Sequence, residues 1–429
     1  MTVGMASGIS ARGYNRILGS NDRMNVAIFG CYRRFGGLAS SVVTLPNSDL
    51  LYVSDVDARR QEAAIGKVAE MGAEKPKGES DFRVILENPD IDAVFVAIPD
   101  HWHAAASLMA MEAGKHVYVE KPCSHNPHES ELLVHFQQYH NKVVQMGNQQ
   151  RSAPSSQEVM KAIHAGEIGE VYSATAFYTN RRGRVPNRTQ VEVPGYLNWE
   201  LFQGPAPRRP YFDILGDYNW HWDWHYGTAE TGNNATHEID VARWALDVKY
   251  PNQVKVNSGK YHFVDDGWPM YDTMDATFVY DNGRSIKWDG KSRSGHSTYG
   301  SGRGTIIYGA KGSVYVDRGG FKMYNRDGEL MVQRFETGEE GSTNLGGGGD
   351  MTTLHVHNFF EAIRGKEKQN SPIDEGAIST NLCHYANISS RLGDITLEVN
   401  KENGKIRDKG IMDKFWSRDY EPGWELPAM

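Results

Sequence analysis

The chain has 429 residues, 39% hydrophobic and 23% charged, which is typical of a globular protein long enough for two domains. Its net charge of -8 argues against nucleic acid or an anionic membrane as the main partner. No apolar run reaches the length of a membrane span. The 3 cysteines, Cys31, Cys123 and Cys383, form no C-x-x-C pair, so neither a disulfide framework nor a zinc site is predicted.

The first 23 residues are small, polar and weakly periodic. They lack the basic start and apolar centre of a signal peptide. We interpret residues 1–23 as an arm that precedes the first domain.

Residues 24–148 alternate between apolar strands and helical spacing. The predicted strands include "MNVAIFG" (24–30), "DLLYVSDVD" (49–57), "AVFVAI" (93–98) and "HVYV" (116–119). Continuous apolar runs such as "AVFVAI" indicate strands buried on both faces. Strands that alternate with helices predict an α/β domain with a doubly wound parallel sheet.

Four of these strands end in a glycine or in polar and ionisable residues of the kind that bind ligands. In such a fold the ligand lies at the carboxyl ends of the strands. The ends carry Gly30, Asp55, the segment 99–103 and the segment 120–122. A Glu-Lys-Pro strand end is by itself usually only solvated, but four marked ends on one edge predict a binding site.

The glycine loop "GCYRRFGG" (30–37) matches the dinucleotide fingerprint G-x-G-x-x-G weakly, because Tyr32 stands at the second glycine. Asp55 strengthens the match, since a carboxylate there can bind ribose hydroxyls and repel a ribose phosphate. NAD is therefore favoured over NADP, although Arg33 and Arg34 could attract a phosphate. A helix N-cap is the alternative role for Asp55. The predicted cofactor contacts are Gly30, Tyr32, Arg33, Arg34, Asp55, Pro99, His101, His103 and Glu120.

Residues 149–393 have a different sequence pattern. Alternating segments turn at Asp/Asn-Gly and Gly-Gly, which predicts a large, mostly antiparallel sheet in an α+β domain. Helices are expected on one face, and the other face is expected to stay open. Residues 394–429 are predicted to be a polar tail, with Trp416 and Trp424 as anchors.

A helix is predicted over residues 236–246, with His237 in its first turn. A helix N-terminus holds a histidine towards the neutral form, which suits proton acceptance, although capping or packing is the simpler role. His221 and His225 lie in the aromatic loop "NWHWDWHYG" without a clear carboxylate partner, so no metal site is predicted.

Four segments resemble the Gfo/Idh/MocA oxidoreductases, relatives of glucose-fructose oxidoreductase and inositol dehydrogenase. They are "PDHWHAAASLMAMEAGKHVYVEKP" (99–122), "GNNATHEIDVARWAL" (232–246) and "HNFFEAIRG" with "CHYANISSRLG" near the end. The resemblance runs from about Met24 to Gly393 and implies a Rossmann domain followed by an open-faced sheet domain.

The resemblance also implies roles. Lys121 is matched to the lysine that contacts the oxidised substrate hydroxyl, and His237 to the proton-transfer histidine. Asn233 stands where the family often has an aspartate, so it can hydrogen-bond a hydroxyl but cannot act as a base. Sugar hydroxyls are further expected at Tyr178, Arg181, Arg182 and His225, with a solvated strand end as the simpler role for the first three.

The first function that follows is NAD(P)-dependent oxidation or reduction of a sugar or glycoside hydroxyl by hydride transfer. The alternative is an NAD-dependent glycosidase or 3-keto-glycoside lyase, which oxidises transiently and then eliminates. A nucleotide-binding regulator without turnover is a third possibility.

The resemblance carries two further expectations. A homo-oligomer packed through the C-terminal sheet is one of them. The N-terminal segment resembles the arm of an exported branch, which favours a periplasmic location with the export signal absent from this chain; the cytoplasm is the alternative.

Overall fold

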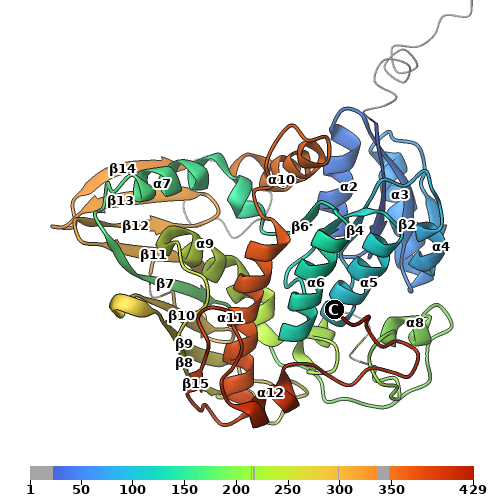
Figure 1. Ribbon diagram of the computed structural model, residues 1–429. Coiled ribbons are helices and arrows are strands. Elements are labelled where there is room, and N and C mark those ends of the chain that lie inside the picture. The colour runs from blue at the N-terminus through green and yellow to red at the C-terminus, as the bar shows by residue number, and fades with distance from the viewer. Residues whose placement is uncertain (1–22, 214, 216–217, 298, 336–346) are drawn as a thin grey trace, which may run out of the picture.

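The computed structural model describes residues 23–213, 215, 218–297, 299–335 and 347–429, which form two sheets with their covering helices (Figure 1). Apart from Arg23, the predicted N-terminal arm lies outside these residues. No helix within the described ranges combines the length and the apolar character needed to cross a membrane.

The first sheet has six parallel strands in the order β3-β2-β1-β4-β5-β6, which confirms the predicted doubly wound domain. Its strands are β1 (Met24–Phe29), β2 (Ser48–Ser54), β3 (Lys77–Glu79), β4 (Ala93–Val96), β5 (His116–Val119) and β6 (Val144–Met146). The short strands β3 and β6 were not predicted, because three residues are too few to show a period.

Helices cover both faces of this sheet. One face carries α2 (Phe35–Thr44), α3 (Ala58–Glu70) and α10 (Gly347–Ile363), and the other α4 (Phe82–Leu86), α5 (Asp100–Glu112) and α6 (Pro127–Tyr139). Helix α10 places Val356, Phe359 and Phe360 in the same core as α2, although it comes from the far end of the sequence. The predicted division at residue 148 therefore does not separate two independent cores.

The second sheet has nine strands in the order β14-β13-β12-β11-β7-β10-β9-β8-β15. Only the β7–β10 pairing is parallel, so the prediction of a mostly antiparallel sheet is confirmed. Its strands are β7 (Val171–Thr179), β8 (Gln253–Gly259), β9 (Thr273–Val279), β10 (Ser285–Lys291), β11 (Arg303–Gly309), β12 (Gly312–Val316), β13 (Gly320–Asn325), β14 (Leu330–Phe335) and β15 (Leu397–Glu398).

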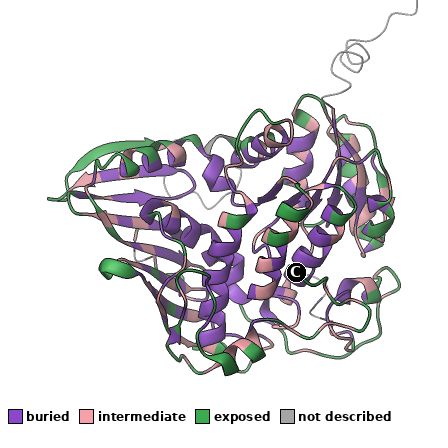
Figure 2. Ribbon diagram, viewed as in Figure 1, coloured by how far each residue is buried: buried purple, intermediate pink, exposed green. Residues whose placement is uncertain are grey.

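One face of the second sheet is packed and the other is open. Alternate residues of β9, namely Met274, Ala276 and Phe278, are buried in the core formed with α7 (Pro154–His164), α9 (Thr236–Leu246) and α11 (Ile373–Arg391). Helix α11 stands between the two sheets (Figure 1) and is largely buried (Figure 2). The open face is largely polar: it carries Ser173, Thr175, Asp275, Thr277, Lys287 and Asp289 beside Tyr172 and Tyr308.

Shorter elements complete the chain: α8 (Trp199–Gln203), α12 (Lys409–Phe415), the 3₁₀ turns Gln149–Ser152, Asn219–Trp222 and Asp281–Gly283, and the π-helical turn Thr231–Ala235.

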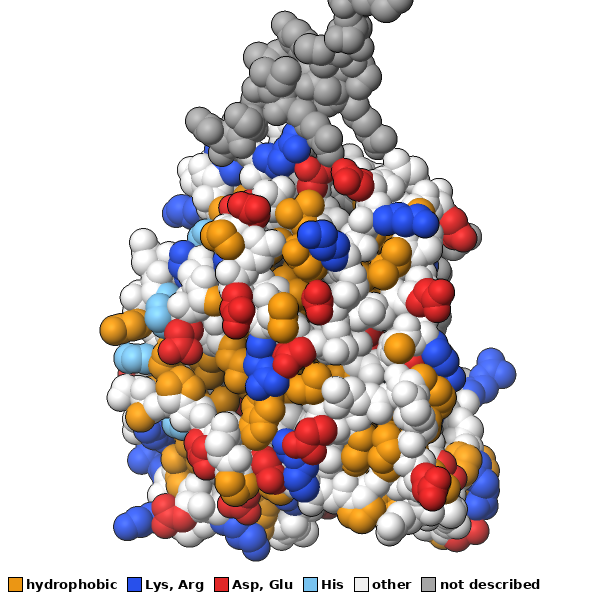
Figure 3. Space-filling model, turned by 90° about the vertical axis from the view of Figure 1, so that its right-hand side faces the viewer, with side chains coloured by type: hydrophobic (Ala, Val, Ile, Leu, Met, Phe, Trp, Pro, Cys, Tyr) orange, Lys and Arg blue, Asp and Glu red, His pale blue; other side chains and the backbone are white. Residues whose placement is uncertain are grey.

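Both predicted anchors of the C-terminal tail are confirmed. Trp416 donates a hydrogen bond to Glu131 (2.8 Å), and Trp424 packs edge-on against Trp102. The tail therefore fastens onto the first domain. Figure 3 shows acidic and basic side chains interspersed on that side of the molecule.

Candidate active site

The carboxyl ends of four parallel strands lie in register. Phe29 of β1 pairs with Ser54 of β2 and Val96 of β4, and Val96 pairs with Val119 of β5. The residues that follow leave the sheet along one edge, as the sequence predicted. A cavity of about 300 Å³ opens there, lined both by these strand ends and by residues of the second sheet and its helices.

Gly30 makes the tight turn at the end of β1. Its φ is +98°, and a Cβ there would lie 2.2 Å from the carbonyl oxygen of Ala97. Only glycine fits both conditions. Tyr32, at the place of the second fingerprint glycine, is 41% exposed, and the guanidinium of Arg60 lies 4.1 Å from its ring centre. The bulky side chain is thus partly turned to solvent at the cavity.

Asp55 holds the loop at the end of β2. Its two carboxylate oxygens accept from the backbone N–H groups of Cys31 (2.8 Å) and Asp57 (2.9 Å). Burial nevertheless raises the pKa of Asp55. The N-cap of α3 is Asp57, which accepts from the N–H of Arg59, so the alternative role for Asp55 is excluded. A tight glycine turn and a carboxylate at the next strand end fit a dinucleotide.

Glu120 is buried and fixed by two donors. Arg34 donates through Nε (2.8 Å) and Gln149 through Nε2 (3.0 Å). Burial opposes its charge, but Arg34 and Lys121 outweigh burial and hold the pKa of Glu120 below its usual range. The glutamate therefore braces the turn formed by residues 120–122.

Lys121 reaches from the first domain to the turn that precedes α9. Its Nζ donates to the main-chain oxygen of Asn233 (2.7 Å) and lies 3.4 Å from the Asn233 side-chain oxygen. Burial lowers the pKa of Lys121 to about 8; Glu120 and Asp100 oppose this shift, whereas Arg318 and Arg303 add to it.

His237 lines the same cavity, is 5% exposed, and makes no hydrogen bond with any described residue. Burial, followed by the charges of Arg318 and Lys121, holds its pKa well below the usual value. The imidazole is therefore neutral, but the predicted cause was wrong. Helical backbone continues from the π-helical turn into α9 through Ala235, so no free helix terminus lies beside His237.

Several cavity residues were not predicted. Arg303 begins β11 and donates through Nε to Glu238 (2.7 Å), while Arg318 lies in the turn between β12 and β13. Tyr218 and, from the aromatic loop that follows it, Trp220 also line the cavity, together with His221, which the sequence offered only as an extra base for elimination. The loop's aromatic density was a signal for these three, but nothing local in the sequence marked the two arginines.

Five predicted contacts, His101, Tyr178, Arg181, Arg182 and His225, do not line this cavity. His101 is buried, with Nε2 2.8 Å from the carbonyl oxygen of Phe202. Tyr178 is buried beside Arg182, Arg181 is exposed, and His225 lies elsewhere. The remaining predicted residues do line it: Gly30, Tyr32, Arg33, Arg34, Asp55, Pro99, His103, Glu120, Lys121, Asn233 and His237.

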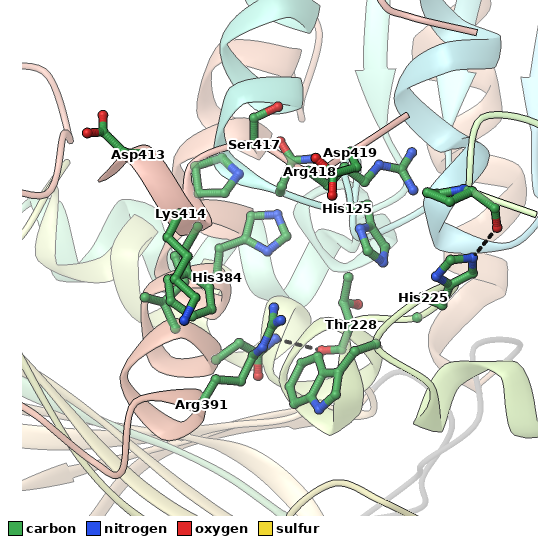
Figure 4. A pocket seen from close by; sticks show the side chains of 18 residues that line it. His125, His225, Thr228, His384, Arg391, Asp413, Lys414, Ser417, Arg418 and Asp419 are labelled. Carbon is green, nitrogen blue, oxygen red and sulfur yellow. Dashed lines mark hydrogen bonds between the residues drawn. The ribbon is translucent and has the colours of Figure 1, made fainter. Parts of the chain in front are cut away.

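His225 belongs to a second cavity of about 380 Å³ between the start of α6, one side of α11 and the C-terminal tail (Figure 4). A short wall separates the two cavities: Thr228 lines the second and donates to Asp100, which lines the first (2.5 Å). No group of three or more His, Cys, Asp or Glu within the described ranges could hold a metal ion.

Comparison with known proteins agrees with this architecture. Residues 24–148 match the model of an oxidoreductase family with an NAD-binding Rossmann fold, and residues 156–315 match the GFO/IDH/MocA C-terminal domain. Levoglucosan dehydrogenase of Pseudarthrobacter phenanthrenivorans is 30% identical over 39% of this chain and 36% of its own length. A glycosyl hydrolase family 109 protein of Saccharopolyspora erythraea is 29% identical over 46% of this chain and 45% of its own length.

The fold has solved counterparts. A levoglucosan dehydrogenase in complex with NADH and levoglucosan superposes with a TM-score of 0.67 at 20% identity, covering 88% of this chain and 99% of that one. The matched segments of the two sequence relatives cover less than half of either relative. Two family models in the correct order and a shared architecture lead to one conclusion: the chain belongs to the GFO/IDH/MocA family of oxidoreductases, and its first domain is an NAD-binding Rossmann domain.

Proposed function

We propose that this protein oxidises a hydroxyl of a sugar or glycoside, with NAD as the hydride acceptor. The observation that carries the proposal is that Lys121 and His237 line one cavity at the carboxyl edge of the NAD-binding sheet. A cationic donor and a neutral proton acceptor are the two groups that alcohol oxidation requires. Levoglucosan dehydrogenase among the relatives supports a carbohydrate substrate.

Gly30, Arg33 and Asp55 would hold the dinucleotide. The turn at Gly30 lets backbone approach a pyrophosphate, and Asp55 keeps lone pairs for ribose hydroxyls beside its two backbone contacts. When bound, NAD supplies a nicotinamide ring that accepts a hydride. The ion pair of the half-buried Arg34 with the buried Glu120 holds the turn at residues 120–122 in place.

Lys121 polarises the substrate hydroxyl. Its ammonium already donates to an amide oxygen of Asn233, and a substrate oxygen can take another of its three N–H groups. Because the lysine is half-buried, its positive charge stabilises a developing alkoxide more strongly than it would in water. The side chain of Asn233, in contact with the Tyr218 hydroxyl, can orient a neighbouring hydroxyl without taking its proton.

His237 accepts the proton that leaves the hydroxyl. Its ring has no other described hydrogen-bond partner, and the cations around it keep it unprotonated and ready to accept. Protonation would add a positive charge beside Lys121, so the proton is expected to be passed on quickly to solvent.

A second candidate is elimination of a glycosidic group after transient oxidation. His221 favours it, because this second neutral imidazole lines the cavity and is stacked on Trp220. It could remove the proton from the carbon next to a transient ketone. A family 109 glycosyl hydrolase among the relatives supports this route.

Two measurements test these proposals. Mass spectrometry of the denatured protein for co-purified nucleotide comes first, followed by a screen of sugars and glycosides at 340 nm. Net NADH formation supports oxidation, and aglycone release without net NADH supports elimination. If the protein binds NAD but gives neither NADH nor free aglycone with any sugar or glycoside, both the oxidation and the elimination proposals are refuted.

We further propose a homo-oligomer packed through the open face of the second sheet, where Tyr172 is 50% exposed beside Tyr308. Light scattering at micromolar concentration tests this, and a monomer would contradict it. We also propose a periplasmic location, which cell fractionation would test.

A further inference from the structure

The second cavity contains a cation without a counter-charge. Arg391, at the end of α11, lines it and is accessible to solvent. Its guanidinium lies 5.0 Å from the ring centre of Trp224 and 4.9 Å from that of Phe415. None of the described residues accepts a hydrogen bond from it or forms an ion pair with it. Figure 4 shows it pointing from α11 towards the middle of the cavity.

Two aromatic rings hold this guanidinium in place without using its N–H groups. An arginine positioned in this way keeps a planar fork of donors that matches a carboxylate or a phosphate. The surrounding residues exclude enough water to lower the pKa of Arg391, and no carboxylate offsets that effect. An anion bound to the fork would supply the missing charge.

The rest of the wall offers more donors than acceptors. Arg418 Nη1 and Asn126 Nδ2 are buried without a partner among the described residues. Two of the acceptors are already engaged: the Asn387 side-chain oxygen accepts from Thr231 and Tyr271, and His384 Nε2 pairs with the Ser124 hydroxyl. The neutral ring of His125, which has no partner among the described residues, offers one donor and one acceptor. The unpartnered N–H groups of Arg418 and Asn126 can donate hydrogen bonds to a bound anion.

The other charges at this site lie on the C-terminal tail. Arg418 is paired with Glu129, so it contributes donors but little net charge. Lys414, Asp413 and Asp419 are exposed, and no described ion pair joins any of them. The carboxylate of Asp413 points away from the cavity (Figure 4). Water screens these exposed charges. Arg391 is exposed as well, but its side chain points towards the middle of the cavity (Figure 4).

We propose that this second cavity binds a small oxyanion, a carboxylate or a phosphate group carried by a polyhydroxylated molecule, with Arg391 as its principal ligand. The volume of about 380 Å³ suits a ligand the size of one monosaccharide. The site is distinct from the NAD cavity, since the Thr228–Asp100 contact stands between them. It does not depend on the proposed oxidation, so it can be tested by binding alone.

The experiment is calorimetry on the full chain saturated with NAD, which blocks the pyrophosphate site. Inorganic phosphate and glucuronate are titrated at constant ionic strength, with glucose as the neutral control. We expect millimolar or tighter binding of at least one anion and none of glucose at this site. Which anion binds identifies the carried group as phosphate or carboxylate.

Variants decide whether the signal belongs to this cavity. Arg391→Gln should lower the affinity for the anion at least about tenfold, which is the usual scale for the loss of one charged hydrogen bond. The affinity for NAD should stay the same. Arg391→Lys should give an intermediate loss, because it keeps the charge but not the fork. Arg326→Gln, which removes an 80% exposed arginine in the β13–β14 turn, is the matched control and should change nothing.

Two substitutions on the exposed tail are further controls for charge near the cavity. Lys414→Gln and Asp413→Asn should change the affinity for the anion little, because water screens both charges. The expected dissociation constant is about 1 mM or lower. The proposal is overturned if neither phosphate nor glucuronate binds at concentrations up to about 50 mM. It is equally overturned if Arg391→Gln binds the anion as well as the unmodified chain does.

Discussion

The Nζ atom of Lys121 lies 2.7 Å from the main-chain oxygen of Asn233, although 112 positions separate the two residues. One residue ends a strand of the parallel sheet, and the other lies in the π-helical turn that leads into α9. This hydrogen bond links the NAD-binding domain to the segment that carries His237. It fixes the lysine in the cavity before a substrate arrives, which reduces the entropy lost on binding.

The pH dependence of kcat/KM follows from the position of Lys121. The lysine must carry its proton to stabilise an alkoxide, and burial lowers its pKa to about 8. Above that pH it loses the proton, so kcat/KM should fall about tenfold per pH unit. His237 adds no limb there, because its pKa is shifted downward. A pH profile of the initial rate measures this.

Lys121→Arg provides the control for that profile. A guanidinium keeps its charge throughout the range, so the fall above pH 8 should disappear even if the rate is lower overall. An unchanged alkaline limb in this variant would assign the titration to another group.

A pair of glycine substitutions tests the turn at the end of β1. Gly30→Ala would place a Cβ 2.2 Å from the Ala97 carbonyl oxygen at a φ of +98°, so it should cost more than about 1 kcal/mol of unfolding free energy and weaken NAD binding. Gly66→Ala in α3 meets nothing within 4 Å and should be neutral or stabilising. Thermal unfolding of both variants gives the comparison, and equal effects would contradict the account.

Asp55 should set the preference for NAD over NADP. Asp55→Asn removes the charge that repels a ribose phosphate and weakens the bonds to ribose hydroxyls, so NAD affinity should fall about tenfold or more and the preference should narrow. Fluorescence titration with both nucleotides measures it. Asp90→Asn, an exposed position, is the control for charge. Tighter binding of NADP than NAD by the unmodified chain would show the assignment to be wrong.

The sequence predicted the edge of the site better than its far wall. The marked strand ends Gly30, Asp55 and Glu120 could be located because a parallel sheet places all carboxyl ends on one edge, whatever the loops do. Arg303 and Arg318 depend on how distant antiparallel strands pair, and no local pattern encodes that. His225 was misplaced for a similar reason: a loop with several aromatic residues does not reveal which cavity each side chain enters.

The central claim is that Lys121 and His237 act on the same substrate hydroxyl. A double-mutant cycle on kcat tests it most directly. Lys121→Met and His237→Ala should each bind NAD normally yet lose about a hundredfold or more in kcat. Because both groups serve one hydroxyl, the double variant should lose little more than either single variant. Losses that multiply would show that the two groups act independently, and near-normal turnover in both single variants would place the active site elsewhere.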